Sequence, residues 1–445
     1  MDGNNVVLNI DINIQKIVEK YVTEFNEEHR NEASEGLGSK HTAVIVMDPN
    51  TGAVLAMCSY PYYNLNDPTD LTYLGQYTEE EVEAMSNEEV SEARNDMWRN
   101  FCISDTYEPG STFKPFTVAI GLETGVLSGS EYYYCDGYEV INGTTVKCSH
   151  TSGHGSITFN EAISLSCNDA LMQMSYLIGT ENFVKYQAIF GFGKKTGIDL
   201  QGEVNAAGLL FTVDNMDSLD LAVNSFGQNF NTTMIQMMAG FCALVNGGYY
   251  YQPQVAARIE NTDGDVITEF EPKLLKQVVS EETSEIIREA LLETVESGTA
   301  VSAQVEGYSV GGKTGTAEKF PRGEGTYLVS FMGCVPADDP EVCFYVVVDE
   351  PNVESQADSK LAVTLCQNIM SEVLPYLNVT TTAEEEGTEE EVEIDWSVGS
   401  DETWDNDESF SDEDISYPET EESDYYTTGD TAYSGDDETY GNEGE

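Results

Sequence analysis

Ser111 and Lys114 are the residues best suited to covalent chemistry, because the lysine follows the serine by three positions. Pro109-Gly110 favours a sharp turn, so Ser111 is predicted at a helix start with Lys114 one turn later on the same face. A serine hydroxyl becomes nucleophilic when a base takes its proton, and a lysine can be that base once burial or a nearby cation lowers its pKa. The helix N-terminus would direct N–H groups at a developing oxyanion. Most Ser-x-x-Lys pairs are solvated, so this pair alone is weak evidence.

A second candidate element is Ser166-Cys167-Asn168, at the predicted start of a helix. A serine hydroxyl can relay a proton, and an asparagine amide can both donate to and accept from a peptide. Serine and asparagine are also common helix caps, so a purely structural role is the alternative interpretation.

The third element is Lys313-Thr314-Gly315-Thr316, which follows two glycines on a predicted strand. Glycine lets another backbone approach closely. Lys313 is a candidate cation for a substrate carboxylate and for lowering the pKa of Lys114. The threonines offer hydroxyls, and a strand edge offers N–H and C=O groups to an extended peptide. A phosphate-binding Walker loop is not expected here.

The three elements occur in an order and on predicted elements typical of β-lactamases and penicillin-binding proteins. Over roughly residues 5–378 the sequence resembles the transpeptidase domain of class B penicillin-binding proteins, the group of division and sporulation D,D-transpeptidases. The segments that carry this resemblance outside the three elements include residues 47–56, 104–110, 153–155, 226–228, 246–248 and 349–351.

The resemblance implies a role for each residue of the three elements. Ser111 would be the acylated nucleophile and Lys114 its general base. Ser166 would relay the proton to the leaving amine, and Lys313 would supply electrostatic stabilisation. The substrate-binding residues would be Asn168, Thr314, Gly315 and Thr316, with the backbone N–H groups of Ser111 and Thr316 forming the oxyanion hole.

The implied reaction is peptidoglycan cross-linking by ping-pong acyl transfer, in which D-Ala leaves and a neighbouring stem peptide's amine resolves the ester. No cofactor or metal is expected. The implied partners are peptidoglycan stem peptides, β-lactam antibiotics, and a membrane glycan polymerase if the parent protein is anchored. The implied location is the outer face of the bacterial cytoplasmic membrane or the cell wall. The sequence shows no signal peptide and no membrane-spanning segment, so the chain is expected either to be a fragment or a late start, or to depend on a separate anchor.

Three alternatives stay open. A D,D-carboxypeptidase differs only in using water as the acceptor. A serine β-lactamase needs a carboxylate that activates water, and Glu203 with Asn205 is a faint echo of that pattern, interpreted as a surface loop. A non-catalytic penicillin-binding scaffold is the third. The sequence contains no glycosyltransferase-like region.

The elements that must position these residues form an α/β (α+β) pattern. Strand-like segments at 42–48, 53–58, 308–317, 327–335 and 342–349 lie at both ends of the chain and bracket a helical middle. The simplest packing is one central antiparallel sheet of about five strands, flanked by helices. The resemblance adds an all-helical subdomain. Helices are expected near 14–25, 79–99, 116–122, 159–178, 234–245, 284–295 and 359–377.

Charge limits the partners of this 445-residue chain and divides it into two parts. The chain carries 81 acidic and 19 basic residues, a net charge of −62, which disfavours binding to nucleic acid or anionic lipid. Residues 384–445 contain 26 Asp and Glu but no Lys or Arg. We therefore predict a transpeptidase domain over residues 1–382 and a disordered acidic tail over 383–445.

The nine cysteines include no C-x-x-C pair, which disfavours a zinc or thioredoxin-like interpretation. Cys135 and Cys148 flank a glycine-containing loop and would form a local bridge outside the cell, with ordinary thiols as the equal alternative. His150 and His154 would be a metal pair only on a helix, which Gly153 and Gly155 disfavour. A structural role for this loop, near the second element, is expected.

Overall fold

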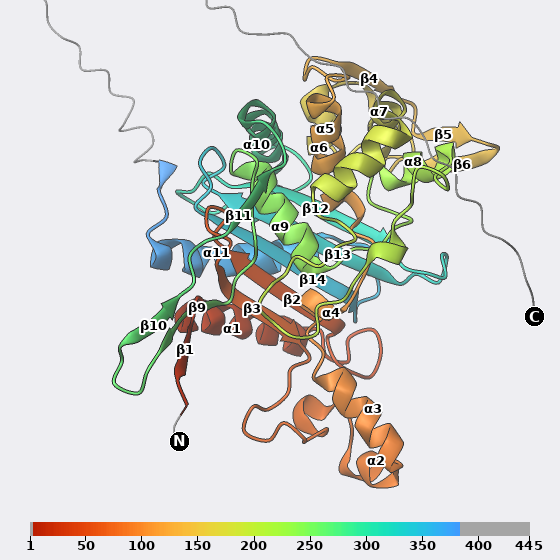
Figure 1. Cartoon of the computed structure of the whole chain (residues 1–445). Helices are drawn as coiled ribbons and strands as arrows, with labels where there is room; N and C mark the ends of the chain where they lie inside the picture. Colours follow the sequence, from red (N-terminus) through yellow and green to blue (C-terminus); the bar gives the residue numbers. More distant parts are fainter. Residues whose placement is uncertain (1–2, 383–445) are drawn as a thin grey trace, which may run out of the picture. The chain divides into compact units, whose positions relative to one another are not determined.

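The computed structural model describes residues 3–382 and contains a central sheet of five antiparallel strands in the order β12-β13-β14-β2-β3 (Figure 1). Strands from both chain ends meet where β14 pairs with β2, so the predicted fold class is confirmed. The predicted tail, residues 383–445, lies outside the described residues. The strands of this sheet are β2 (Ser39–Met47), β3 (Val54–Tyr60), β12 (Gly311–Glu318), β13 (Tyr327–Val335) and β14 (Val342–Pro351).

Both faces of this sheet are buried, which explains the continuous apolar run in β14. Alternate residues of a strand point to opposite faces. Tyr345 and Val347 accordingly belong to one core, whereas Phe344 and Val346 belong to another. Each fully buried side chain of this size contributes roughly 1.5–3 kcal/mol. The sheet is therefore a rigid base for the residues that its edge carries.

Two helices from opposite ends of the chain cover one face. They are α1 (Ile12–Glu28) and α11 (Lys360–Leu377), which pack against each other and against the sheet. Asp11 caps α1, since its carboxylate accepts hydrogen bonds from the backbone N–H groups of Asn13 and Ile14 at 2.7 and 3.3 Å. Ile14, Val18 and Val22 of α1 are fully buried.

The helical subdomain covers the other face. Its helix α9 (Met234–Val245) is buried along its whole length and has the predicted bounds. The predicted helix over 159–178 is wrong as one helix, because residues 165–167 break it into α6 and α7. The other helices here are α4 (Phe101–Ser104), α5 (Lys114–Glu123), α6 (Phe159–Ser164), α7 (Asn168–Ile189), α8 (Ser218–Asn224) and α10 (Glu281–Glu296).

Short strands and helices complete the described part of the chain. Two small hairpin-like sheets pair β4 with β7 and β5 with β6, next to α6 and α7. The predicted charged segment 79–99 forms two helices, each opened by a capping box. None of the helices within residues 3–382 is both long and apolar enough to span a bilayer. The bounds are α2 (Glu79–Ala84), α3 (Asn87–Met97), β1 (Asn5–Leu8), β4 (Tyr132–Cys135), β5 (Tyr138–Ile141), β6 (Thr144–Lys147), β7 (Gly155–Thr158), β8 (Tyr249–Tyr251), β9 (Ala256–Glu260), β10 (Val266–Glu269) and β11 (Leu274–Gln277).

Candidate active site

Ser111 lies on a single 3₁₀ turn, Gly110–Phe113, that leads directly into α5. A 3₁₀ helix has three residues per turn, so side chains three positions apart lie one above the other. This geometry places Ser111 and Lys114 on the same side of the chain, as predicted. Ser111 is partly exposed and Lys114 is fully buried. Among the described residues, the Ser111 side chain has no hydrogen-bond partner, so its hydroxyl is available to an incoming group.

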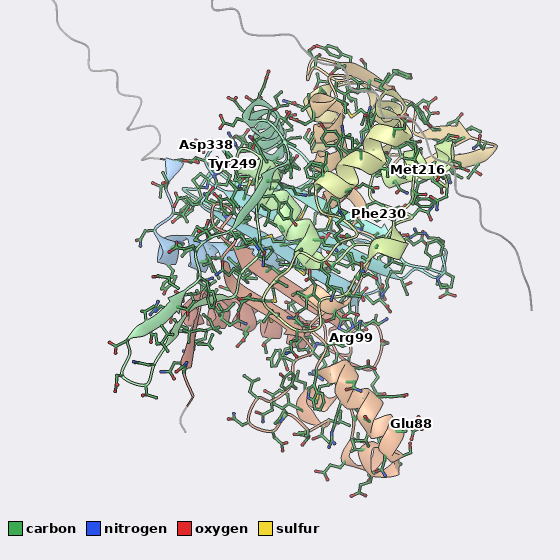
Figure 2. All side chains as sticks on the ribbon, viewed as in Figure 1. Glu88, Arg99, Met216, Phe230, Tyr249 and Asp338 are labelled. Atoms are coloured by element: carbon green, nitrogen blue, oxygen red, sulfur yellow. The ribbon has the colours of Figure 1, made fainter. Side chains whose placement is uncertain are left out.

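A cluster of packed aromatic rings anchors this turn in the protein core. The Phe113 ring packs edge-on against the ring of Phe230, which Figure 2 labels, with centroids 4.8 Å apart. It also contacts the Phe116 and Phe192 rings, with centroids 5.4 and 5.3 Å away. Such pairs contribute roughly 0.5–1.5 kcal/mol beyond the area that they bury. Phe113, the residue directly before Lys114, is thus anchored in the helical core.

Glycines allow three backbones to meet at the turn. Gly110 donates its N–H to the Gly227 carbonyl at 2.8 Å, and a Cβ on Gly227 would lie 2.0 Å from the Gly110 oxygen. A Cβ on Gly110 would lie 2.7 Å from the Thr316 carbonyl oxygen of β12. In an antiparallel strand the N–H and C=O of one residue point to the same side, so the Thr316 N–H also faces the turn.

Ser166 occupies the sharp turn between α6 and α7. The Ser166 N–H bonds to the Ile163 carbonyl and the Cys167 N–H to the Ala162 carbonyl, both at 3.0 Å, which is the Schellman pattern of a helix end. Ser166 takes the left-handed position of this motif, with φ of 55°. That position usually holds glycine, and for other residues it costs about 1–3 kcal/mol. Asn168 then opens α7.

The two lysines meet at the Ser166 hydroxyl. Lys114 Nζ donates to Ser166 Oγ at 3.0 Å, to the Ser166 carbonyl at 2.6 Å and to Asn168 Oδ1 at 2.7 Å. Lys313 Nζ donates to the same Ser166 Oγ at 2.9 Å. A hydroxyl oxygen has two lone pairs, so these two bonds fill them and leave the hydroxyl proton free to be donated elsewhere.

Neither lysine of this network forms an ion pair within residues 3–382. Burial lowers the pKa of Lys114 to about 8, an effect that the nearby Cys167 and Cys148 thiols oppose. Burial, followed by repulsion from Lys114, also places the pKa of Lys313 well below its usual range. Burial therefore makes it easier for Lys114 to lose a proton, and the uncharged amine is the form that can accept one.

The strand β12 lies at the edge of the sheet and carries the third element. Lys313 is fully buried, Thr314 is nearly so, and Thr316 is partly exposed. Thr314 Oγ1 lies 3.3 Å from Thr299 Oγ1. A Cβ on Gly315 would lie 2.3 Å from Ser330 Oγ and 2.9 Å from Thr112 Cγ2, so glycine here permits the contact between strand and turn.

Residues 307–314 do match the Walker pattern Gly-x-x-x-x-Gly-Lys-Thr, with Gly307 and Gly312 as its glycines, although no such loop was expected. The structure excludes a Walker loop. Lys313 and Thr314 lie within a strand that pairs with β13 along its length, whereas a phosphate-binding loop must open a helix.

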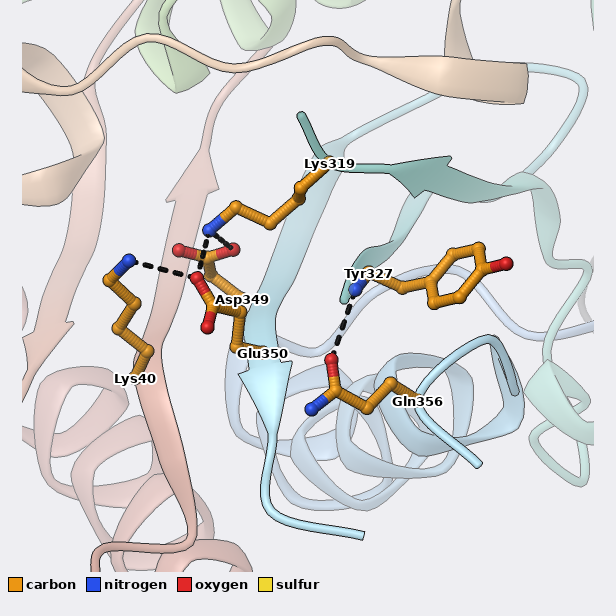
Figure 3. Close-up of polar contacts among 6 residues, drawn as sticks. All are labelled: Lys40, Lys319, Tyr327, Asp349, Glu350 and Gln356. Atoms are coloured by element: carbon orange, nitrogen blue, oxygen red, sulfur yellow. Dashed lines mark hydrogen bonds and ion pairs between the residues drawn. The ribbon is translucent and has the colours of Figure 1, made fainter. Parts of the chain in front are cut away.

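Beyond the end of β12, an ion-pair cluster ties the edge strand to the sheet (Figure 3). Lys319 Nζ contacts Asp349 Oδ1 at 2.6 Å and Glu350 Oε1 at 2.5 Å, and Lys40 Nζ contacts the same Glu350 atom at 2.8 Å. The Tyr327 N–H donates to Gln356 Oε1 at 3.0 Å. This cluster fixes the exposed end of the strand.

Near the site, the surroundings of Glu203 and His154 differ from expectation, whereas Cys135 and Cys148 take one of their two expected states. Glu203 is buried rather than on a surface loop, and its carboxylate accepts hydrogen bonds from Thr196 and Gly197. Cys135 and Cys148 are free thiols. His150 and His154 lie on a loop, as expected, but His154 Nδ1 lies 3.7 Å from Cys148 Sγ, a proximity that sequence reasoning missed. The regular spacing of Cys135, Cys148, His154 and Cys167, with 12, 5 and 12 residues between them, was the available signal.

Comparison with known proteins identifies the family. A family model described as the penicillin binding protein transpeptidase domain matches residues 42–371. The chain is 36% identical over 383 residues to stage V sporulation protein D of Bacillus subtilis, covering 85% of this chain and 54% of that protein. It is 28% identical over 363 residues to penicillin-binding protein PbpB of Mycolicibacterium smegmatis, covering 79% and 51%. The chain thus spans about half the length of these relatives.

Comparison with solved structures points to the same family. The D,D-transpeptidase domain of a peptidoglycan glycosyltransferase from Eggerthella lenta matches with a TM-score of 0.70 and 27% identity, covering 84% of each chain. Penicillin-binding protein 3 from Mycobacterium tuberculosis, complexed with aztreonam, matches with a TM-score of 0.71 and 26% identity, covering 85% of this chain and 80% of that one. This chain therefore belongs to the penicillin-binding protein transpeptidase domain family, in its class B group of division and sporulation proteins.

Proposed function

We propose that this chain is a serine D,D-transpeptidase that cross-links peptidoglycan stem peptides and is acylated by β-lactams. The observation that carries the proposal is the hydrogen-bonded network of Lys114, Ser166 and Lys313 beside the turn that bears Ser111. Membership of the transpeptidase family supports it.

In the proposed reaction, each step is assigned to a named group. Ser111 Oγ attacks the penultimate carbonyl of the donor peptide and loses its proton to Lys114 Nζ. The N–H groups of Ser111 and Thr316 stabilise the oxyanion. When the C–N bond breaks, the Ser166 hydroxyl gives its proton to the leaving D-Ala nitrogen and is reprotonated from the lysines. An amine of a second stem peptide then attacks the ester and frees Ser111.

Substrate binding uses the sheet edge and the second element. The donor peptide lies along β12 as an added strand, which supplies affinity through main-chain hydrogen bonds. Thr314 and Thr316 bind its terminal carboxylate, and Asn168 holds the peptide through its amide. Gly315 supports this binding by letting β12 lie close to the turn that bears Ser111. Lys313 stabilises the negative charge that develops.

Labelling with a fluorescent penicillin tests the proposal. Ser111→Ala should abolish covalent labelling, whereas Ser371→Ala, on the outer helix α11, should label like the parent protein. Intact-mass measurement should give one adduct per chain, located on Ser111. Stoichiometric labelling of the Ser111→Ala protein would reject the assignment.

The molecule that accepts the acyl group, an amine or water, distinguishes a transpeptidase from the alternative enzymes. A donor peptide ester incubated with a D-amino acid should give the exchanged peptide. Hydrolysis alone would indicate a carboxypeptidase, and many turnovers of nitrocefin per site would indicate a β-lactamase. The position of Glu203, engaged by Thr196 and Gly197, gives no support to the latter.

The same proposal includes the extent of the catalytic domain and the location of the enzyme in the cell. The catalytic domain comprises residues 1–382, so a chain ending at Thr382 should label like the full chain. We place the enzyme at the outer face of the bacterial cytoplasmic membrane, with a membrane glycan polymerase as partner. Crosslinking of this protein to its neighbours in intact bacterial cells tests that partnership.

A further inference from the structure

Three thiols and one imidazole converge behind the second element. The potential ligand atoms of Cys135, Cys148, His154 and Cys167 all lie within 4.8 Å of one another. The three cysteines are at most 2% exposed, and His154 is half-buried. They come from the end of β4, the loop after β6, the residue before β7, and the turn between α6 and α7. Four separate segments thus direct soft ligands at one point.

The two distances from Cys148 match the edges of a metal tetrahedron. Zinc binds sulfur at about 2.3 Å and nitrogen at about 2.0–2.1 Å, so tetrahedral ligands stand about 3.8 Å apart for two sulfurs and about 3.6 Å for sulfur and nitrogen. In this structure Cys148 Sγ lies 3.8 Å from Cys167 Sγ and 3.7 Å from His154 Nδ1. A disulfide would need sulfurs about 2.05 Å apart.

Backbone contacts hold the two loops in this position. Cys148 donates its N–H to the Gly137 carbonyl at 2.8 Å, and Cys135 pairs with Gly155 in the register of β4 and β7. A Cβ on Gly153, whose φ is 81°, would lie 2.5 Å from the Cys135 carbonyl oxygen. Glycine at 153 therefore lets the loop fold back far enough to bring His154 to the thiols.

We propose that Cys135, Cys148, His154 and Cys167 form a structural zinc site. A Cys₃His set suits zinc because thiolate and imidazole are its preferred ligands, and four protein ligands leave no open position for chemistry. The earlier expectation of no metal rested on the absence of a C-x-x-C pair, which this set does not need.

The site would act on the proposed active site through Cys167, which stands between Ser166 and Asn168. Cys167 Sγ also accepts the Ala170 N–H at 3.4 Å at the start of α7. A metal bond at Cys167 would fix the strained left-handed Ser166 and so hold its hydroxyl between the two lysines. This consequence rests on the proposed function, whereas the metal site does not.

Metal content of the purified full-length chain tests the site. Protein prepared under reducing conditions should contain one zinc per chain by mass spectrometric elemental analysis. After chelation, Co²⁺ should bind with the sulfur-to-metal charge-transfer absorption of thiolate ligation. Cys148→Ala should lower the zinc affinity by at least about tenfold, whereas the matched buried-core variant Cys366→Ala should keep it. Circular dichroism checks that both variants fold.

Other outcomes would overturn the proposal. Wild-type protein that carries reduced thiols and takes up neither Zn²⁺ nor Co²⁺ would do so. So would a Cys148–Cys167 disulfide, seen as a non-reduced chain lighter by two hydrogens. If Cys148→Ala does not fold, His154→Ala replaces it, and full zinc content in that folded variant would exclude the proposed ligand set. None of these readouts depends on acyl transfer.

Discussion

The two ends of β12 place lysine in opposite surroundings. Lys313, near the start of the strand, is fully buried, and its side-chain contacts are the neutral oxygens of Ser166 and Thr314. Lys319, just beyond the end of the strand, is partly exposed and contacts the carboxylates of Asp349 and Glu350 (Figure 3). One edge strand therefore carries an amine that burial drives toward the neutral form and an amine held as a charged anchor.

This difference assigns the reaction to the buried lysines and a structural role to the ion-pair cluster around Lys319. A buried amine without a carboxylate partner loses its proton easily, and Lys114 shares this environment with Lys313. The cluster at the other end stabilises the strand and leaves the reaction to the buried pair. Variants at the two ends should therefore have different effects on acylation, and each prediction below tests that division.

Replacing Lys114 should give the largest effect. Lys114→Met keeps most of the side-chain volume but removes the base, so acylation by penicillin should slow by about 10²–10⁴-fold. Lys319→Met is the matched change in the ion-pair cluster beyond the end of β12. It should slow acylation by less than about 10-fold, since it removes only an ion pair. Second-order labelling rates measure both. Equal losses would show that Lys114 is not the base.

Disrupting the proposed zinc site should come next. Without a metal bond at Cys167, Ser166 would no longer be held in its left-handed turn, and a misplacement of about 1 Å can cost about 100-fold. We expect Cys148→Ala to slow acylation by about 10–100-fold, with Cys366→Ala unchanged. If zinc is lost while the acylation rate stays normal, the metal stabilises the loops without positioning Ser166.

Changing the pH should alter the acylation rate less than the Lys114→Met and Cys148→Ala substitutions do. Lys114 must be neutral to accept the Ser111 proton, and its pKa is lowered to about 8. The acylation rate should therefore rise through pH 8 and level off above it, by about tenfold between pH 7 and 9. Burial favours the neutral form of Lys114, whereas Cys167 and Cys148 oppose it. Lys319→Met should keep this profile, and a flat profile would contradict a lysine base.

The regular elements were predictable from sequence because their patterns are local. The helix Met234–Val245 is apolar apart from Gln236, has a capping box at Thr233 and Gln236, and is followed by glycines. The strand Tyr327–Val335 is likewise mostly apolar, with Ser330 as its polar residue. In both cases the residues that fix the bounds lie within or beside the element, so propensity and capping suffice.

The break at Ser166 and the thiol cluster were not predictable in the same way. Residues 159–178 have helical composition throughout, and serine rarely takes the left-handed position that ends α6. The geometry there follows from bonds that Lys114 and Lys313 make from distant parts of the chain. The four proposed metal ligands lie in loops, where no periodicity indicates that they converge. Tertiary contact, not local pattern, decides both features.

The smallest effect on acylation should come from the anchor cluster. Asp349→Asn leaves Lys319 with Glu350 alone and removes a nearly buried carboxylate from its partner. We expect a loss of about 1–3 kcal/mol in the free energy of unfolding, measured with urea, because a buried charged hydrogen bond is lost. The exposed Asp338→Asn is the matched control and should change that free energy by less than about 0.5 kcal/mol. Penicillin acylation of the folded Asp349→Asn protein should fall by less than about threefold, since this carboxylate makes no contact with Lys114, Ser166 or Lys313. A loss as large as that of Lys114→Met would mean that the charged end of β12 takes part in the reaction.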